Sequence, residues 1–245
     1  MFYELKIAIK TIQFEGPAPL FHKISEYFSE LLQAPFLTIP ENLSLEELVD
    51  FVCNTKLISA GQTKSEFLEL ARLVKEKCPV NVLEIGTARG GSLATWCQLA
   101  HPLATIVSVD LPGGIHGGGF SFWRGLMYRR IFPKRSQKLH LIRADAHSPI
   151  TVANVAKVFP NGIDFLFIDA DHRYEGVKSE FELYWQFVNA GGIVVVCDIA
   201  PHPKEFNCQA DRFWGEIKDK FCGTEIMARH GVYCGGFGII RKEQI

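Results

Sequence analysis

Five acidic residues of this chain each stand at or near the end of an apolar run. The first follows Val82 and Leu83 and comes two residues before Gly86. A short apolar run that ends at glycine is typical of a strand buried on both faces. Carboxylates at the ends of such strands can accept hydrogen bonds, hold cations or take part in proton transfer. The five residues are Glu84, Asp110, Asp145, Asp169 and Asp198.

The apolar runs alternate with amphipathic segments between residues 62 and 241. The continuous hydrophobicity of VLEI, IVSV, FLFI and IVVV favours strands covered by helices on both faces. We therefore predict an α/β fold with a doubly wound, mostly parallel sheet of seven strands. Ligands bind beyond the carboxyl ends of the strands in such sheets, so the five carboxylates are expected to line one edge. Any one of them could instead cap a helix or form a turn.

Helices are also predicted ahead of the sheet. Residues 21–32 and 44–53 repeat apolar side chains at intervals of three and four, and Ser44 stands where a helix N-cap is expected. Residues 61–78 form a further amphipathic helix that leads into the first strand. We divide the chain into a helical extension at residues 1–60 and a Rossmann-like domain at residues 61–245.

The segment after Glu84 reads GTARGG, residues 86–91. It matches a relaxed dinucleotide-binding pattern, in which a pyrophosphate lies at a helix N-terminus. Glu84 would repel a pyrophosphate but suits a ligand that carries an ammonium and a sulfonium group, such as S-adenosylmethionine (SAM). Asp110 is placed to accept both ribose hydroxyls, because a carboxylate offers two oxygens. Asp145 and Ala146 are placed to meet the adenine.

Together, VLEIGTARGGS, IVSVD, LIRAD and FLFIDADH resemble the successive motifs of the class I, Rossmann-like SAM-dependent methyltransferases. The run that begins IDADHRYEG is similar to cephalosporin-hydroxylase-like and macrocin-type O-methyltransferases. The resemblance implies methylation of a small-molecule or sugar hydroxyl. It also implies a cofactor site, although Ser92 could instead cap the helix that begins beside it. That site comprises Glu84, Gly86, Thr87, Gly90, Ser92, Asp110, Asp145 and Ala146.

His172 and Asp169 are the candidate catalytic residues. His172 lies just past a predicted strand, where a general base would stand, and an ordinary pKa near ~6.5 suits that role at neutral pH; a structural histidine is the alternative. The related metal-dependent enzymes imply Mg²⁺ held by Asp169 and Asp198. The sequence departs from them at Cys197, a poor ligand for a hard cation. Without a metal, Asp198 would orient His172 or cap a helix.

The composition bears on partners and compartment. With 26 basic and 27 acidic residues the net charge is -1, so the overall basic charge of a typical nucleic-acid binder is missing. No apolar run approaches the ~20 residues of a membrane span. Seven scattered cysteines without CxxC spacing favour a reduced, cytoplasmic protein. We expect a small-molecule or glycan acceptor, with no membrane span, and leave open whether the chain forms a homo-oligomer.

A long connection, residues 111–138, joins two predicted strands. Its glycines and the aromatic residues Phe120, Phe122 and Trp123 predict a mobile lid over the ligand. Its basic residues would contact a phosphorylated, lipid or RNA partner, or form a solvated helix face. The basic loop leaves an RNA methyltransferase as one alternative to a small-molecule O-methyltransferase. Two further alternatives are a nicotinamide-dependent oxidoreductase and a non-catalytic cofactor-binding protein.

Overall fold

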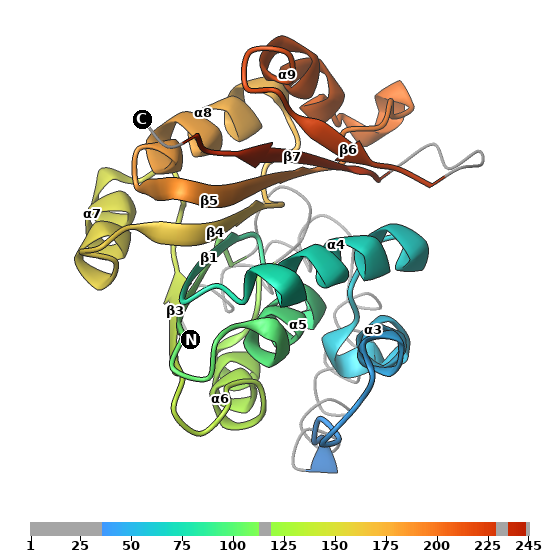
Figure 1. Cartoon of the computed structure of the whole chain (residues 1–245), viewed down its shortest axis with the longest axis vertical. Helices are drawn as coiled ribbons and strands as arrows, with labels where there is room; N and C mark the ends of the chain where they lie inside the picture. The colour runs from blue at the N-terminus through green and yellow to red at the C-terminus, as the bar shows by residue number, and fades with distance from the viewer. Residues whose placement is uncertain (1–35, 113–118, 229–234, 244–245) are drawn as a thin grey trace, which may run out of the picture.

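The computed structural model describes residues 36–112, 119–228 and 235–243, which form a central sheet with helices on both faces (Figure 1). The predicted helix at residues 21–32 lies outside the described residues. The strands are β1 (Asn81–Ile85), β2 (Thr105–Asp110), β3 (Lys138–Arg143), β4 (Ile163–Ile168), β5 (Val188–Cys197), β6 (Thr224–Ile226) and β7 (Phe237–Arg241). The helices are α3 (Leu45–Asn54), α4 (Lys64–Lys77), α5 (Gly91–Leu99), α6 (Phe122–Ile131), α7 (Pro149–Val158), α8 (Tyr174–Trp185) and α9 (Ala210–Ile217), with short 3₁₀ turns η2 (Lys56–Ile58) and η3 (Lys204–Phe206).

The sheet has seven strands in the order β3-β2-β1-β4-β5-β7-β6. β1 to β5 run parallel, and β7 pairs antiparallel with β5 and with β6. This confirms the predicted doubly wound, mostly parallel sheet. β6 has only three residues and did not stand out in the sequence, because a run of that length carries little periodicity.

Each face of the sheet has its own apolar core. On one face, residues of α3, α4, α5 and α6 pack on β1, β4 and β5 around the indole of Trp96. The ring of Trp96 makes edge contacts with Phe67, Phe165 and Phe167. On the other face, α7, α8 and α9 cover the sheet with side chains such as Phe181. Burial on both faces explains why the central strands are apolar throughout.

The start of α3 confirms the predicted N-cap. The Glu47 backbone N–H donates to the Ser44 hydroxyl over 3.2 Å, and the Ser44 N–H donates to the Glu47 carboxylate over 2.7 Å. α3 and η2 lie within residues 1–60, and their apolar side chains join the same core as α4 and α5. The domain boundary at residue 60 stays a prediction.

The connection between β2 and β3 differs from the predicted loop, because its second half forms α6. Phe120 does not form a lid. Its side chain is buried in the core and its ring centroid lies 5.5 Å from that of Tyr128. Phe122 and Trp123 are half exposed at the start of α6. Residues 113–118 of this connection lie outside the described residues.

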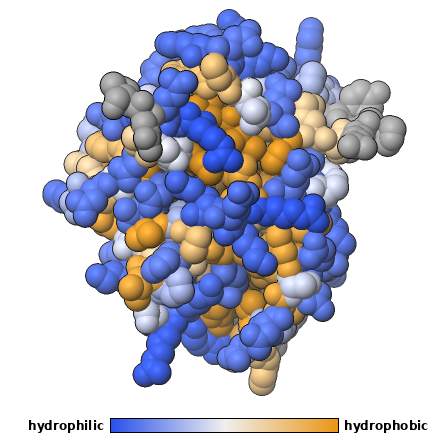
Figure 2. Space-filling view, in the orientation of Figure 1, coloured by the Kyte–Doolittle hydropathy of each residue, from blue (hydrophilic) through white to orange (hydrophobic). Residues whose placement is uncertain are grey.

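Polar side chains cover most of the face of the molecule shown in Figure 2, with apolar side chains visible between them. None of the helices in the described part of the chain combines the length and apolar character needed to cross a bilayer.

Candidate functional site

A cavity of about 610 Å³ opens at the carboxyl ends of the parallel strands. Its wall includes residues from the ends of β1, β2, β4 and β5, together with the segment 61–63 that precedes α4. This size falls within the range of small-molecule sites. The cavity residues that the sequence had also pointed to are Gly86, Asp110, Asp145, Ala146, Asp169, His172 and Asp198.

Gly86 is required by the close approach of two strand ends. Its φ of +89° lies in the left-handed region, and a Cβ there would collide with the backbone of Asp169. The backbone N–H of Asp169 donates to Ile85 over 2.8 Å, which draws the end of β4 against β1. The glycine thus keeps β1 and β4 together at the wall of the cavity.

Gly90 and Gly91 are explained by packing within the protein, and neither lines the cavity. Gly90 has a φ of +87°, and an added Cβ would lie 2.7 Å from the ring of Tyr128. A Cβ on Gly91 would collide with the backbone of Ala60. The sequence analysis placed Gly90 in the cofactor site. In the structure, α6 packs against Gly90, and the segment after η2 packs against Gly91.

Glu84 lies beneath the glycine loop rather than at the cavity wall, and its side chain is fully buried. Its Oε1 accepts hydrogen bonds from Ser92 Oγ at 2.6 Å and from Trp96 Nε1 at 3.1 Å. Burial raises the pKa of Glu84 to about 8, against the hydrogen bonds from Ser92 and Thr87. Its Oε2 is buried and has no hydrogen-bond partner among the described residues. Ser92 therefore does not cap α5, whose N-cap is Gly90.

Asp110 shapes the loop and also lines the cavity. Its Oδ2 accepts hydrogen bonds from the backbone N–H groups of Thr87 at 2.9 Å and Ala88 at 2.7 Å. Burial raises the pKa of Asp110, although these bonds act in the opposite direction. The Thr87 hydroxyl turns away from the cavity wall and bonds Ser108. Oδ2 already accepts two hydrogen bonds from the loop. We therefore expect only Oδ1 of Asp110, and not both oxygens, to accept a ribose hydroxyl.

At the end of β3 the cavity is lined by Asp145, Ala146 and His147. The Asp145 carboxylate accepts a hydrogen bond from the His147 N–H at 2.9 Å and lies 3.0 Å from the Nδ1 atom of the same residue. The carbonyl of Ala146 accepts a hydrogen bond from the Tyr184 hydroxyl at 2.8 Å. His147 was missed in the sequence because it follows the motif without belonging to it.

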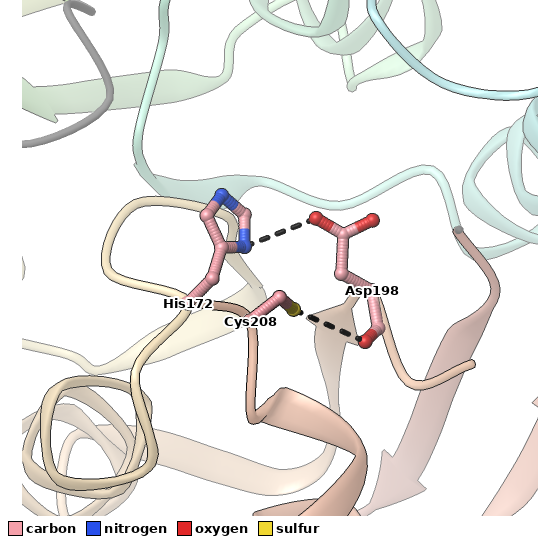
Figure 3. A group of neighbouring side chains, drawn as sticks. All are labelled: His172, Asp198 and Cys208. Atoms are coloured by element: carbon pink, nitrogen blue, oxygen red, sulfur yellow. Dashed lines mark hydrogen bonds and ion pairs between the residues drawn. The ribbon is translucent and has the colours of Figure 1, made fainter. Parts of the chain in front are cut away.

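His172 and Asp198 face each other at the ends of β4 and β5, with Nδ1 of the histidine 3.0 Å from Oδ2 of the aspartate (Figure 3). Burial alone would lower the pKa of His172, but the hydrogen bond to Asp198 and the charges of Asp169 and Asp198 raise it to about 9. The expected ordinary pKa is therefore wrong for this site. Two metal-free roles were considered for Asp198, orienting His172 or capping a helix. The geometry matches the first role, because the N-cap of α9 is Gln209 and not Asp198.

Asp169 is held in place by a hydrogen bond from Gln62, whose Nε2 donates to its Oδ2 over 2.7 Å. The Cys197 side chain also favours the ionised form of Asp169 and lowers its pKa. Burial and the charge of Asp198 raise the pKa of Asp169 to about 7, while His172 lowers it. Gln62 precedes α4, more than a hundred residues from Asp169, and no motif announces it.

Glu180 is a third cavity residue that the sequence did not reveal, after His147 and Gln62. It projects from α8 and is 1% exposed. Burial raises its pKa well above the ordinary value, and the charge of Asp171 adds to the effect. His147 approaches it, with Nε2 lying 3.9 Å from Oε1 of Glu180. The cavity is therefore lined by more titratable groups than the strand ends supply.

The donor set does not favour Mg²⁺ between Asp169 and Asp198. Asp169 accepts a hydrogen bond from Gln62, and Asp198 pairs with His172. Burial raises the pKa of Cys197, so its thiol stays protonated and is no ligand for a hard cation. The Mg²⁺ site stays a prediction, and no step proposed below uses it.

Residues 83–199 match the protein family described as "Methyltransferase domain". The matched segment runs from β1 to just past the end of β5 and is similar to a methyltransferase domain. The resemblance inferred from the strand-end motifs is thereby confirmed. A curated relative, the uncharacterized protein R132 of Acanthamoeba polyphaga mimivirus, is 32% identical over 123 residues, which make up 50% of this chain and 53% of that protein. The chain thus spans about half the length of the curated relative it matches.

Solved structures share the fold of the methyltransferase domain. The O-methyltransferase from Bacillus cereus in complex with SAH (S-adenosylhomocysteine) is 18% identical, with a TM-score of 0.53 over 87% of this chain and 97% of that chain. TomG from Streptomyces achromogenes, in complex with SAM, is 16% identical, with a TM-score of 0.54 over 91% of this chain and 96% of that chain. MycE, in complex with Mg and SAH, is 19% identical, with a TM-score of 0.53 over 82% of this chain and 55% of that chain. These likenesses confirm the Rossmann-like methyltransferase fold.

Proposed function

We propose that this protein transfers a methyl group from SAM to a hydroxyl of a small molecule or sugar. The observation that carries the proposal is the His172–Asp198 pair at the wall of the cavity of a methyltransferase domain. A histidine backed by a carboxylate is a general-base arrangement. TomG was solved in complex with SAM and the Bacillus cereus enzyme in complex with SAH, which supports the choice of cofactor.

The residues present fit SAM. Asp110, at the end of β2, and Asp145 with Ala146, at the end of β3, line the cavity next to one another in the sheet. We assign the ribose to Asp110 and the adenine to the end of β3. Glu84, Thr87, Gly90 and Ser92 would act from behind the wall by shaping the loop, and Glu84 would also place a buried carboxyl group there.

SAM would supply an electrophilic methyl group, so the protein has to align the acceptor hydroxyl and remove its proton. Asp198 holds the His172 ring through Nδ1, which fixes the ring so that it can take that proton. The His172 imidazole would take the hydroxyl proton of the acceptor as that oxygen gains the methyl group and SAH is released. A positive sulfonium bound in the cavity would lower the raised pKa of His172 and favour the neutral ring that can take the proton.

Asp169 would position the acceptor. It lies on the cavity wall beside Gly86, with Gln62 donating to its Oδ2. A carboxyl group with a pKa of about 7 can accept a hydrogen bond from a hydroxyl when ionised or donate one when protonated. It therefore suits an acceptor with one polar hydroxyl near the methyl group.

The decisive experiment separates the cofactor from the acceptor. Calorimetry with SAM, with its product S-adenosylhomocysteine (SAH) and with NAD sorts methyltransferase from oxidoreductase function. A radiolabelled-methyl screen then compares pooled small molecules, glycans and RNA. We expect binding of SAM and SAH and label in the small-molecule or glycan pool. Label in RNA alone would move the function to RNA methylation, and binding without any label would favour a non-catalytic role. We further propose that the protein is cytoplasmic, because its scattered cysteines lack CxxC spacing and favour a reduced compartment.

A further inference from the structure

We propose that His172, Asp198 and Cys208 form a binding site for a zinc-like transition-metal ion. One ligand atom from each lies within 4.8 Å of the other two. Among the described residues this is the one group of three such side chains that meets this spacing. Figure 3 shows the three side chains converging from the end of β4, the end of β5 and the segment before α9.

The three segments are tied together in advance. The backbone N–H of Gln209 donates to the His172 carbonyl over 2.7 Å, which fixes the Cys208 segment to the end of β4. The Cys208 thiol points to the Asp198 carbonyl at 3.9 Å. Asp198 has a φ of 60°, a left-handed conformation that is unusual for a non-glycine residue, and its N–H donates to Gly236 over 3.0 Å. Backbone hydrogen bonds therefore hold the segments that carry His172, Cys208 and Asp198 in place.

The donor types select the class of ion. Imidazole nitrogen, thiolate sulfur and carboxylate oxygen are the three kinds of ligand that zinc takes in proteins. Zinc bonds of ~2.0–2.3 Å would bring the ligand atoms to within roughly 3.3–3.8 Å of one another, so the observed spacing needs only a small contraction. Mg²⁺ prefers an octahedral shell of oxygens, and a thiolate and an imidazole do not supply it.

Three protein ligands leave a fourth position open on the ion. His202 is a neighbouring donor, with Nε2 lying 3.9 Å from Oδ1 of Asp198. Because His172 and Asp198 line the cavity, the bound ion would lie at its wall. The proposed proton transfer does not use Cys208, so a substitution of Cys208 tests the metal site separately from the general base.

The consequence for activity rests on the proposed function. An imidazole that binds the ion through Nδ1 loses its hydrogen bond to Asp198, and one that binds through Nε2 loses the lone pair that takes the proton. Zinc should therefore inhibit methyl transfer by occupying the general base. Ion binding itself does not depend on any methyl acceptor.

The site is tested first without turnover. Chelator-treated protein is titrated with Co²⁺, whose visible and thiolate charge-transfer absorption reports tetrahedral sulfur ligation, and Zn²⁺ is then added as a competitor. We expect one Co²⁺ per chain, displaced by Zn²⁺ and unaffected by excess Mg²⁺. Cys208→Ser should abolish the charge-transfer band and weaken binding by at least ~10-fold. The control is Cys222→Ser, since Cys222 is exposed and lies outside this cluster.

A thermal melt of each metal-free variant shows whether it folds. A folded Cys208→Ser protein with an unchanged Co²⁺ spectrum would overturn the site, as would a wild-type protein that shows no sulfur ligation. The activity arm is separate: Zn²⁺ should inhibit wild type and inhibit Cys208→Ser at least ~10-fold less effectively. If no acceptor is ever labelled, the proposed function fails while the Co²⁺ result still decides the metal site.

Discussion

The hydroxyl of Ser92 donates a hydrogen bond to Oε1 of Glu84 over 2.6 Å, beneath the glycine loop. Trp96 donates to the same oxygen. The glutamate is thus held by α5, the helix that follows its own strand, in a setting that raises its pKa to about 8 from an ordinary value of 4.5. Since the folded chain binds this proton more tightly than the unfolded chain, stability should fall as pH rises between these two values.

Glu84→Gln should reduce that loss of stability. The amide oxygen can still accept from Ser92 and Trp96, and an amide does not ionise. Below pH ~4.5 the variant should resemble wild type, and near pH ~8 it should be more stable by roughly 1–3 kcal/mol. Urea unfolding of both proteins across this pH range measures the difference. Parallel pH curves for the two proteins would show that Glu84 does not titrate as described.

The same variant tests the assignment of Glu84 to the cofactor. If the buried Oε2 faces the ammonium of SAM, Glu84→Gln should weaken SAM binding by ~10-fold or more while the protein remains folded. SAM and SAH both carry the ammonium, so both should be affected. Unchanged affinity for both, measured by calorimetry, would leave Glu84 with a structural role only.

His172→Ala should lower turnover by ~10²-fold or more and leave SAH affinity nearly unchanged, as expected for the loss of a general base. In metal-free wild type, kcat/KM should rise with pH towards the pKa of about 9. Asp198→Asn removes the charge that raises this pKa, so its profile should rise at lower pH and reach a lower maximum. Normal turnover in His172→Ala would make the histidine structural, and an Asp198→Asn profile at higher pH would contradict the pairing.

The sheet and the location of the site were predictable because they depend on local patterns. Continuous apolar runs such as VLEI reported burial on both faces, and a parallel sheet brings its carboxyl ends to one edge. The direction of Glu84 could also have been predicted. It alternates with Leu83 and Ile85, whose side chains belong to the opposite core, so it points towards α5 and away from them.

The rest of the site depends on contacts between distant segments. Gln62 reaches Asp169 from before α4, Glu180 enters the cavity from α8, and Cys208 meets His172 from before α9. None belongs to a strand-end motif. Phe120 was assigned to a lid because it follows glycines, but the structure buries it against Tyr128. Sequence spacing does not report such packing between elements.

Asp110→Asn should weaken SAH binding by ~1–3 kcal/mol, because the ribose would lose a charged acceptor. It should also lower stability, since Oδ2 accepts the N–H groups of Thr87 and Ala88. Asp164→Asn is a matched control. Its Oδ2 accepts the N–H groups of Val80 at 3.1 Å and Asn81 at 2.9 Å, and it does not line the cavity.

Calorimetry and a thermal melt of both aspartate variants separate binding from folding. We expect both melts to fall and only Asp110→Asn to lose SAH affinity. An equal loss of affinity in Asp164→Asn would mean that general destabilisation, and not the ribose contact, explains the result. Full SAH affinity in Asp110→Asn would remove the ribose from Asp110.

Gly90→Ala tests whether the second glycine of the loop is needed by the protein or by the ligand. A Cβ would lie 2.7 Å from the Tyr128 ring in a residue whose φ is +87°. Strain and overpacking should together cost roughly 1–3 kcal/mol of stability. Gly215→Ala is the control: Gly215 lies in α9 with nothing within 4 Å of an added Cβ, so alanine there should stabilise by up to ~1 kcal/mol.

The unfolding free energies and the SAH affinities of the two glycine variants distinguish the explanations. If packing against α6 is the reason for Gly90, Gly90→Ala loses stability, and pairing it with Tyr128→Phe recovers little, because the ring atom Cζ remains in place. Tyr128→Ala in the same chain should relieve the clash, so the double variant should lose less stability than the sum of the two single variants. Strict additivity, or a loss of SAH affinity at unchanged stability, would instead assign Gly90 to ligand approach and restore the interpretation that the glycine pattern first suggested.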